Sequence, residues 1–201
     1  MTLAPPLRPL PRAFFERPTE LVARALLGKL LVRTGPSPRI ARLVEGEAYL
    51  GERDQASHAR RGPTPRAAIM FGPAGHLYVY LVYGMHHCMN VVTESDGTAG
   101  AVLLRAAEPL AGPEPFETFE AFEDRLALTG PGKLCRGLGI TREHNGLDLS
   151  EGHGLFLAED DAPAPRIKRS ARIGVAYAGA WASRQLRFYV PGNPYVSGRP
   201  R

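Results

Sequence analysis

A chain of 201 residues with 44% hydrophobic residues can bury one sizeable core, and its length does not require a second domain. Its 25 Lys and Arg residues outnumber its 20 Asp and Glu residues, and the formal charge of +5 suits a polyanionic partner without identifying one. Two cysteines in no close-spaced pattern argue against a disulfide-built secreted scaffold, and no apolar run is long enough for a signal peptide or a membrane span. We therefore expect a soluble, cytoplasmic protein.

The N-terminal half of the chain predicts mainly strands. Residues 1–13 form a Pro-rich arm, and the next helix is expected to begin near Pro18, to bury Leu21 on its apolar face and to end at Gly28. Turn-forming residues then separate several apolar runs. The strands predicted from these runs are residues 29–33, 39–50, 77–83, 88–95 and 101–109. The first two are predicted to form a hairpin.

The C-terminal half mixes helices and strands. Phenylalanines at every third position predict a short amphipathic helix over residues 113–128, with its apolar stripe in the core. Residues 129–140 are typical of a loop that enters a helix, residues 155–160 of a strand, and residues 171–197 of a final sheet with an irregular tail. Strands in runs, with helices clustered between them, favour an α+β fold with a mainly antiparallel sheet. One domain should cover residues 14–201.

A pair of carboxylates stands out in the second predicted strand. Strand alternation puts Glu45, Glu47 and Tyr49 on one face, with the carboxylates about 6 to 7 Å apart. On a solvated face this is unremarkable. On an enclosed face the charges repel, so one carboxylate is bound by a cation or has its pKa raised into the range of a general acid or base. Arg105, at the end of an apolar strand, is either that cation or an exposed strand-end arginine; the spacing does not decide which carboxylate reacts.

Several motifs that define other classes of catalytic or binding site are absent or incomplete in this sequence. No G-x-S-x-G or H-E-x-x-H motif occurs, and adjacent strand residues such as His86, His87 and Cys88 point to opposite faces, so they do not form a metal site easily. The run TGPGKLC lacks the complete phosphate-loop motif, although Lys133 at a helix N-terminus could hold a single phosphate group. A structural helix cap explains this run equally well.

Tyrosines are unusually frequent around the predicted strands. Tyr49 and Tyr80 beside a carboxylate would form a pocket with aromatic walls that can hold a flat base, although aromatic residues in sheets are most often core residues. Tyr83 breaks the two-residue alternation and precedes Gly84, which predicts a turn. A protruding aromatic at such a turn resembles the wedges with which some proteins deform DNA.

Five blocks of sequence together resemble the alkyladenine, or 3-methyladenine, DNA glycosylases found in mammals and many bacteria. The match begins near Arg12 and covers nearly all of the remaining chain in family order. The blocks are LVEGEAYLGERDQASHA, TPRAAIMFGPAGHLYVYLVYGMHHCMNVV, AVLLRAAEPL, GPGKLC and RFYVPGNPYVS.

The resemblance implies a single α+β domain with a curved sheet that flips damaged purines out of duplex DNA. It implies that Glu47 is the catalytic base and that Arg105 and the main-chain carbonyl of Ile173 help it to hold the attacking water. The remaining residues fall into three implied groups. They are Tyr49, His58, Tyr80 and Asn90 in the base pocket, Tyr83 as the intercalating wedge, and Met85, His86, Thr64, Arg66 and Lys133 at the DNA backbone or minor groove.

The resemblance also implies the partner and the products. The partner is double-stranded DNA that contains damaged purines, and the reaction leaves an abasic site without a metal or another cofactor. We expect a monomer that does not bind membranes and that lies with the nucleoid if its source is bacterial. A catalytically inactive reader of damaged DNA and a nucleoside hydrolase are the alternatives.

Overall fold

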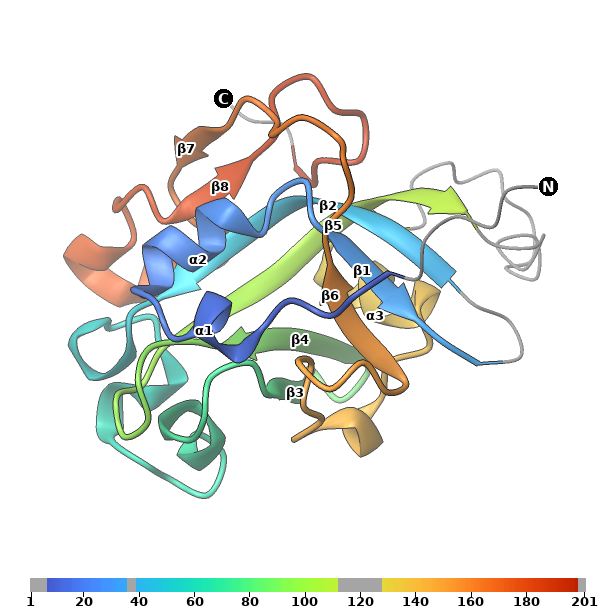
Figure 1. Ribbon diagram of the computed structural model, residues 1–201. Helices are drawn as coiled ribbons and strands as arrows, with labels where there is room; N and C mark the ends of the chain where they lie inside the picture. The colour runs from blue at the N-terminus through green and yellow to red at the C-terminus, as the bar shows by residue number, and fades with distance from the viewer. Residues whose placement is uncertain (1–6, 36–38, 112–127, 199–201) are drawn as a thin grey trace, which may run out of the picture.

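One curled sheet forms the frame of the protein. The computed structural model describes residues 7–35, 39–111 and 128–198, and within them every pairing between named strands is antiparallel (Figure 1). The strand order is β3-β4-β5-β2-β1-β6, with β8 paired to both β2 and β7. The strands are β1 Leu30–Arg33, β2 Arg39–Tyr49, β3 Leu77–Val82, β4 His86–Val92, β5 Ala101–Ala111, β6 Leu155–Ala158, β7 Lys168–Ser170 and β8 Arg187–Tyr189. The predicted single-domain α+β fold with a mainly antiparallel sheet is confirmed.

Strand β2 is the centre of this sheet. It pairs with β5 along one edge, while its other edge pairs first with β1 and then, at residues 45–47, with β8. The segment that carries both predicted carboxylates is therefore flanked by strands on both sides, and both glutamates are fully buried. This excludes the solvated strand face that the sequence left open.

The pairing of β2 with β5 is irregular next to those carboxylates. The paired residues there are Leu43 with Ala107, Glu45 with Ala106, and Gly46 with Leu104. The register thus skips Val44 on one strand and Arg105 on the other. Bulges of this kind twist a strand and re-aim its side chains, and they are frequent beside active sites. Here the irregularity brings Arg105 to both glutamates.

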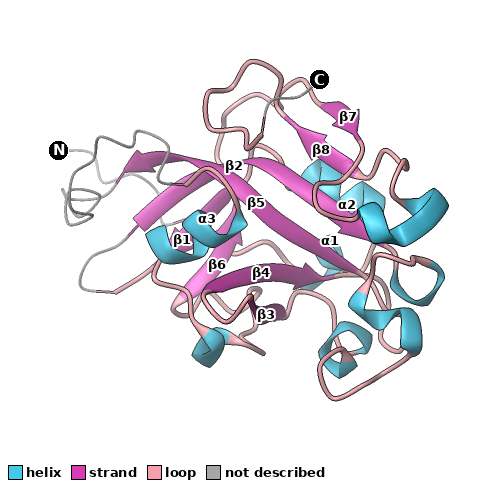
Figure 2. Ribbon diagram, turned by 180° about the vertical axis from the view of Figure 1, so that it is seen from behind, coloured by secondary structure: helices cyan, strands magenta, loops and turns pink. Residues whose placement is uncertain are grey.

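Three α-helices and five short 3₁₀ helices accompany the sheet in the described residues. In Figure 1, α2 lies in front of the sheet and α3 behind it, and Figure 2 shows the same arrangement from the other side. The α-helices are α1 Arg12–Phe15, α2 Thr19–Ala25 and α3 Pro131–Gly137, and the 3₁₀ helices are η1 Gly51–Arg53, η2 His58–Arg61, η3 Ala68–Phe71, η4 Arg142–His144 and η5 Ala176–Trp181.

Helix α2 begins where its sequence predicts but ends at Ala25, three residues before Gly28, and it presents a different face to the core. Pro18 occupies the N-cap, and Gly28 leaves the helix with φ of +90°. Val22 and Leu26 are fully buried, whereas Leu21 is 56% exposed. The predicted burial of Leu21 is therefore wrong, because the buried face also includes Ala23 and Leu27 and so turns Leu21 toward solvent.

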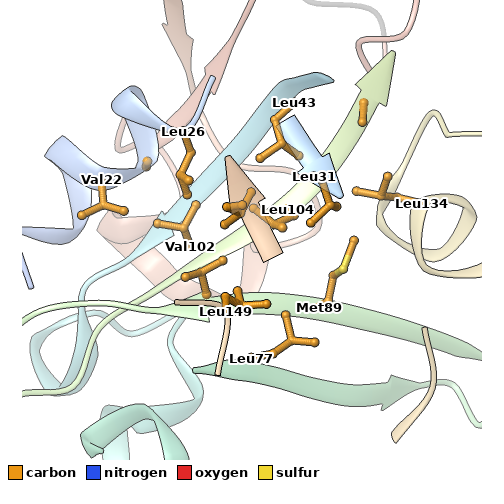
Figure 3. Close-up of a cluster of buried hydrophobic side chains, with 14 of the residues drawn as sticks. Val22, Leu26, Leu31, Leu43, Leu77, Met89, Val102, Leu104, Leu134 and Leu149 are labelled. Atoms are coloured by element: carbon orange, nitrogen blue, oxygen red, sulfur yellow. The ribbon is translucent and has the colours of Figure 1, made fainter. Parts of the chain in front are cut away.

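The hydrophobic core fills the space enclosed by the curl. Side chains from all three described α-helices and from seven strands gather there, and Figure 3 shows how some of them converge. They include Val22 of α2, Leu31 of β1, Leu43 of β2, Leu77 of β3, Met89 of β4, Leu104 of β5 and Leu134 of α3. Burial of apolar surface, at about 25 cal/mol per Å², is the main driving force for this arrangement.

Both ends of the described chain contact the sheet, the N-terminal end at β6 and the C-terminal end at β2 through Ser197 and Glu45. Residues 7–10 of the predicted arm run beside β6, where the amide of Leu10 donates to the carbonyl of Leu157, and Arg12 already begins α1. The predicted helix over residues 113–128 lies outside the described residues apart from Leu128, which is buried. Of the predicted final sheet, only β8 falls within residues 171–197. In the described segments, no helix combines the length and the apolar character needed to cross a membrane.

Candidate active site

A pocket of about 420 Å³ opens beside β3, β4 and β5 and the loop that follows β7. A volume of this size is typical of small-molecule sites. Most of the residues predicted for the base pocket or for catalysis line it, together with two predicted DNA contacts, Arg66 and Tyr83. Those on its wall are Tyr49, His58, Arg66, Tyr80, Tyr83, Asn90, Arg105 and Ile173. Segments far apart in the sequence thus meet at one pocket.

Glu47 lies directly behind this wall and not on it. Its side chain is fully buried, and it contacts three residues that do line the pocket. The Ile173 amide donates to Oε1 at 2.8 Å, the Tyr49 hydroxyl donates to Oε2 at 2.9 Å, and an Arg105 guanidinium nitrogen lies 3.3 Å from Oε2. The structure therefore shows the amide of Ile173 bound to Glu47, while the role of its carbonyl in holding the water stays a prediction.

Glu45 is held by more partners than Glu47. Its Oε1 accepts from Arg105 Nε at 2.8 Å and from Arg187 Nε at 2.7 Å. The Ser197 hydroxyl also donates to Oε1, at 2.9 Å, and the Ser197 amide donates to Oε2 at 2.6 Å. Four hydrogen bonds take up most of the acceptor capacity of a carboxylate, whereas the two bonds of Glu47 leave capacity for a further donor.

The pKa of Glu47 is raised from its ordinary value. Burial, which disfavours the charged form, is the largest cause, and the nearby charge of Glu45 adds to it. The charge of Arg105, the Ile173 amide and the Tyr49 hydroxyl oppose the rise, in that order. A carboxylate with a raised pKa is a stronger base when ionised, so the environment of Glu47 suits proton abstraction from water.

His58 forms one wall of the pocket together with two tyrosines. Its Nδ1 lies 2.9 Å from the Tyr78 hydroxyl, and its ring packs edge-on against Tyr80 with centroids 4.6 Å apart. Burial lowers the pKa of His58 to about 4, and the positive charges of Arg66 and Arg60 add to the effect. The ring is therefore neutral near pH 7, so it offers one donor and one acceptor.

Asn90 and Cys88 line the pocket from β4. The Asn90 side-chain amide donates to the carbonyl of Tyr78 at 3.1 Å, which fixes the orientation of the side chain. Burial raises the pKa of Cys88 to about 11, so its thiol stays protonated near neutral pH. In the part of the chain that the structure describes, no group of three His, Cys, Asp or Glu side chains is placed to hold a metal ion.

Tyr83 stands at the tip of the β3–β4 hairpin and is 89% exposed. Tyr83 and Gly84 have φ of +51° and +68°, and the Met85 amide donates to the carbonyl of Val82 at 3.1 Å. Positive φ values at both central residues of a β-turn are typical of type I′, in which Asn or Gly is favoured. An aromatic residue in this conformation costs about 1–2 kcal/mol, so packing and folding do not explain the choice of Tyr83.

The other predicted DNA contacts surround the pocket without lining it. Met85 is 71% exposed beside Tyr83, and His86 follows it at the start of β4. The start of α3 adjoins the hairpin, because a Cβ at Gly132 would meet the Cβ of His86 at 3.2 Å. Lys133 is exposed on this helix. The structure thus places hairpin and helix side by side at the pocket mouth, where Pro131 also lies.

Thr64 lies in a second hollow, which adjoins the pocket. This hollow of about 330 Å³ shares His58, Arg66 and Tyr177 with the pocket. Its wall also includes Arg60 and Arg61, so three guanidinium groups meet there. Tyr177, which is 66% exposed and lines both hollows, is not among the site residues predicted from sequence.

Four buried residues that organise the site were also missed. No local pattern marks them, because each acts on a partner far away in the sequence. They are Arg187 and Ser197, which bind Glu45, and Asp54 and Arg172, which form a buried ion pair. The only sequence signal for three of them is a charged residue inside an apolar or tightly turned segment, which is also found in many solvated loops; Ser197 has no such signal.

The fold and the pocket define a single-domain enzyme with a buried carboxylate behind an aromatic cavity. A family model for methylpurine-DNA glycosylase (MPG) matches residues 13–194. The chain therefore belongs to the methylpurine-DNA glycosylase family, whose activity is hydrolysis of N-glycosidic bonds.

Similar proteins from three distant sources agree with this family. A protein of Anaeromyxobacter dehalogenans (strain 2CP-1) is 54% identical over 95% of this chain and 86% of its own length. A protein of Methanocella arvoryzae is 50% identical over 94% and 96% of the two chains. A protein of Legionella pneumophila (strain Corby) is 47% identical over 95% and 99%. Each is described as a candidate 3-methyladenine DNA glycosylase.

The neutral state of His58 can be tested directly. Because burial and two arginines lower its pKa to about 4, the ring nitrogens of His58 should keep the chemical shifts of a neutral imidazole from about pH 8 down to about pH 5. Nitrogen-15 NMR of labelled protein, with a His58→Gln variant to assign the signals, measures this. Half-protonation near the ordinary pKa of about 6.5 would contradict it.

Proposed function

We propose that this chain is a monofunctional DNA glycosylase of base excision repair. It flips an alkylated or deaminated purine out of duplex DNA, hydrolyses the N-glycosidic bond and leaves an abasic site. The observation that carries the proposal is the buried Glu47, held against Arg105 and Ile173 directly behind an aromatic pocket. The proposed substrates are of the class of 3-methyladenine, 7-methylguanine, hypoxanthine and ethenoadenine, and the names of the relatives support the first of these.

The base pocket suits a flat purine. Tyr49 and Tyr80 both line it, and a base stacked on these rings gains about 1–3 kcal/mol. An alkylated purine also carries a positive charge, which adds a cation–π attraction of about 0.5–2 kcal/mol that a normal base lacks. His58 offers a hydrogen bond at the edge of the base, and Asn90 disfavours the amino group of guanine.

The proposed hydrolysis uses water as the nucleophile. Ionised Glu47 takes a proton from a water aimed at C1′ while the oxygen–carbon bond forms, and the carbon–nitrogen bond breaks with its electron pair leaving on the base. Arg105 and the carbonyl of Ile173 hold that water, a role supported by their position on the pocket wall beside Glu47. A neutral base such as hypoxanthine must be protonated as it leaves, whereas an alkylated base already carries the charge. No lysine nucleophile takes part, so the strand is not cut.

The surface around the pocket supports binding to DNA. Tyr83 projects from the hairpin and would fill the gap that the flipped nucleotide leaves in the duplex. Thr64 and Arg66, with the neighbouring arginines of the second hollow, would bind the phosphates, and Met85, His86 and Lys133 would contact the backbone or the minor groove. One chain supplies every residue of this scheme, which requires neither a metal nor a cofactor.

Two other functions fit the same pocket less well. A catalytically inactive reader of damaged DNA has no use for a buried carboxylate whose pKa is raised. A nucleoside hydrolase has no use for the strained, exposed Tyr83 at the pocket mouth.

Replacement of the proposed base should separate binding from cleavage. We expect Glu47→Gln to bind a duplex that contains one hypoxanthine within about threefold of the unaltered protein, because the wedge and phosphate contacts remain. Its single-turnover rate should fall by at least about 100-fold, because the general base is lost. Alkali treatment after incubation, which cuts the strand at abasic sites, measures the rate.

The matched control is Glu52→Gln, an exposed glutamate five residues away, which should leave the rate unchanged. Retained turnover in Glu47→Gln would show that another carboxylate is the base. If the unaltered protein released none of the four purines of the proposed class, the proposed function itself would be wrong.

The wedge can be tested without disturbing the hairpin. Asn accepts the positive φ at position 83 more readily than Tyr, so Tyr83→Asn should not lower the free energy of unfolding. It should weaken binding of the lesion duplex by about 5- to 150-fold, the equivalent of about 1–3 kcal/mol of lost stacking. Tyr83→Phe, which keeps the ring, is the control and should bind normally. Fluorescence anisotropy in the Glu47→Gln background measures affinity, and normal affinity of the Asn variant would refute the wedge.

A further inference from the structure

A buried ion pair lies behind the pocket wall, where Arg172 contacts the Tyr49 ring that lines the pocket. Asp54 and Arg172 form two short contacts, of 2.5 and 2.8 Å, and both side chains are fully buried. Burying two charges is unfavourable unless the geometry is good and further hydrogen bonds satisfy them. Here most of the further bonds go to the backbone of the segments that carry the site.

Asp54 and Arg172 together join three such segments. Arg172 donates to the carbonyl of Ala48 at 2.9 Å, next to Tyr49 on β2. Asp54 accepts from the amide of Leu50 on one oxygen and from the amide of Ala56 on the other, both at 3.0 Å. The latter bond fixes the turn that leads to His58. The third segment is the loop of Arg172 itself.

The guanidinium of Arg172 also supports the aromatic wall. Its central carbon lies 4.6 Å from the centroid of the Tyr49 ring. Tyr49 lines the pocket, whereas Arg172 is fully buried and does not, so the guanidinium backs the face of the ring that is turned away from the pocket. A planar cation against a ring holds the ring plane as well as its position.

The residue after Arg172 completes the connection. The Ile173 amide donates to Glu47 at 2.8 Å, and one peptide bond separates this amide from the Arg172 backbone. We propose that Arg172, fixed by Asp54, is a positioning residue that sets both the Tyr49 wall and the amide hydrogen bond to Glu47. This role rests on the proposed function, because it is defined by the base in the pocket and by the carboxylate behind it.

One feature of Arg172 sets it apart from an optimised structural bridge. Its Nε is buried and has no hydrogen-bond partner among the described residues. Buried polar groups are nearly always paired, and those that are not often mark functional sites. The terminal nitrogens of the guanidinium bind the Asp54 carboxylate and the Ala48 carbonyl, and its central carbon lies over the Tyr49 ring, whereas Nε contacts none of these groups.

Loss of the hydrogen bond from the Ile173 amide to Glu47 should change the dependence of the cleavage rate on pH. Catalysis needs ionised Glu47, and the Ile173 amide is one of the groups that lower the pKa of this carboxyl. Without that bond the pKa rises further, so the rate falls off at a higher pH. The titratable and charged groups that face Glu47 are Glu45 and Tyr49 on β2, Arg105 on β5, Tyr80 on β3, Cys88 on β4 and Arg172.

The experiment uses Arg172→Lys, which keeps the charge but not the planar, two-point contact. We expect a folded protein whose single-turnover rate on a 7-methylguanine duplex is about 10- to 100-fold lower, with affinity for the duplex changed by less than about threefold. The acid limb of the rate profile should move to higher pH. Because 7-methylguanine is already cationic and needs no proton to leave, this limb reports the ionisation of Glu47. Arg169→Lys, an exposed arginine on β7, is the matched control and should leave rate and profile unchanged.

A second measurement does not depend on activity. Hydrogen bonding to a carboxylate shifts an amide proton downfield, so the Ile173 amide signal should move upfield in Arg172→Lys and stay in place in Arg169→Lys. If Arg172→Lys does not fold, Asp54→Asn is judged by the same measurements and should give the same defects.

Several outcomes overturn the proposal. A folded variant with the normal rate, the normal pH profile and an unmoved Ile173 signal refutes the positioning role. A slow variant whose pH profile and Ile173 signal are both normal shows that Arg172 is only structural. Inactivity of the unaltered protein counts against the proposed function instead, and the amide signal then decides the positioning alone.

Discussion

Arg105 lies between two buried carboxylates, and the rest of the site depends on this contact. Its Nε binds Glu45 at 2.8 Å, and a terminal nitrogen lies 3.3 Å from Glu47. Two like charges on one strand face would repel, so the arginine between them makes their burial possible. The irregular register of β2 and β5 places it there. Because Arg187 and Ser197 also bind Glu45, that glutamate is the structural anchor, and Glu47 is left as the carboxylate with unused acceptor capacity.

The site is built at some expense of folding stability. Burial raises the pKa of Glu47, Tyr83 adopts a conformation that suits Asn or Gly, and a buried nitrogen of Arg172 has no hydrogen-bond partner among the described residues. Each of these features is unfavourable alone, and each faces or supports the same pocket. The large core within the curled sheet supplies the stability that tolerates them. Their concentration in one place is a physical argument for function that does not depend on similarity to other proteins.

Local sequence patterns predicted most of the strands and the hairpin of the sheet. Alternation placed Glu45, Glu47 and Tyr49 on one face, and the break at Tyr83 marked the hairpin tip. Sequence could not predict that Leu21 is exposed, because that depends on which stripe of α2 meets the sheet. It could not predict Arg172 or Ser197 either, since their partners are more than 100 residues away. Spacing likewise did not decide between the carboxylates; their hydrogen bonds differ, and this difference supports Glu47 as the proposed base.

The division of roles between the two glutamates can be measured as the free energy of unfolding of Glu45→Gln and Glu47→Gln in urea near pH 7. Removing the charge of Glu45 leaves two buried arginines without their shared partner, so we expect a loss of about 3–5 kcal/mol. Because burial disfavours ionised Glu47, its replacement should cost far less or even stabilise the fold. A larger loss for Glu47→Gln than for Glu45→Gln would contradict this account.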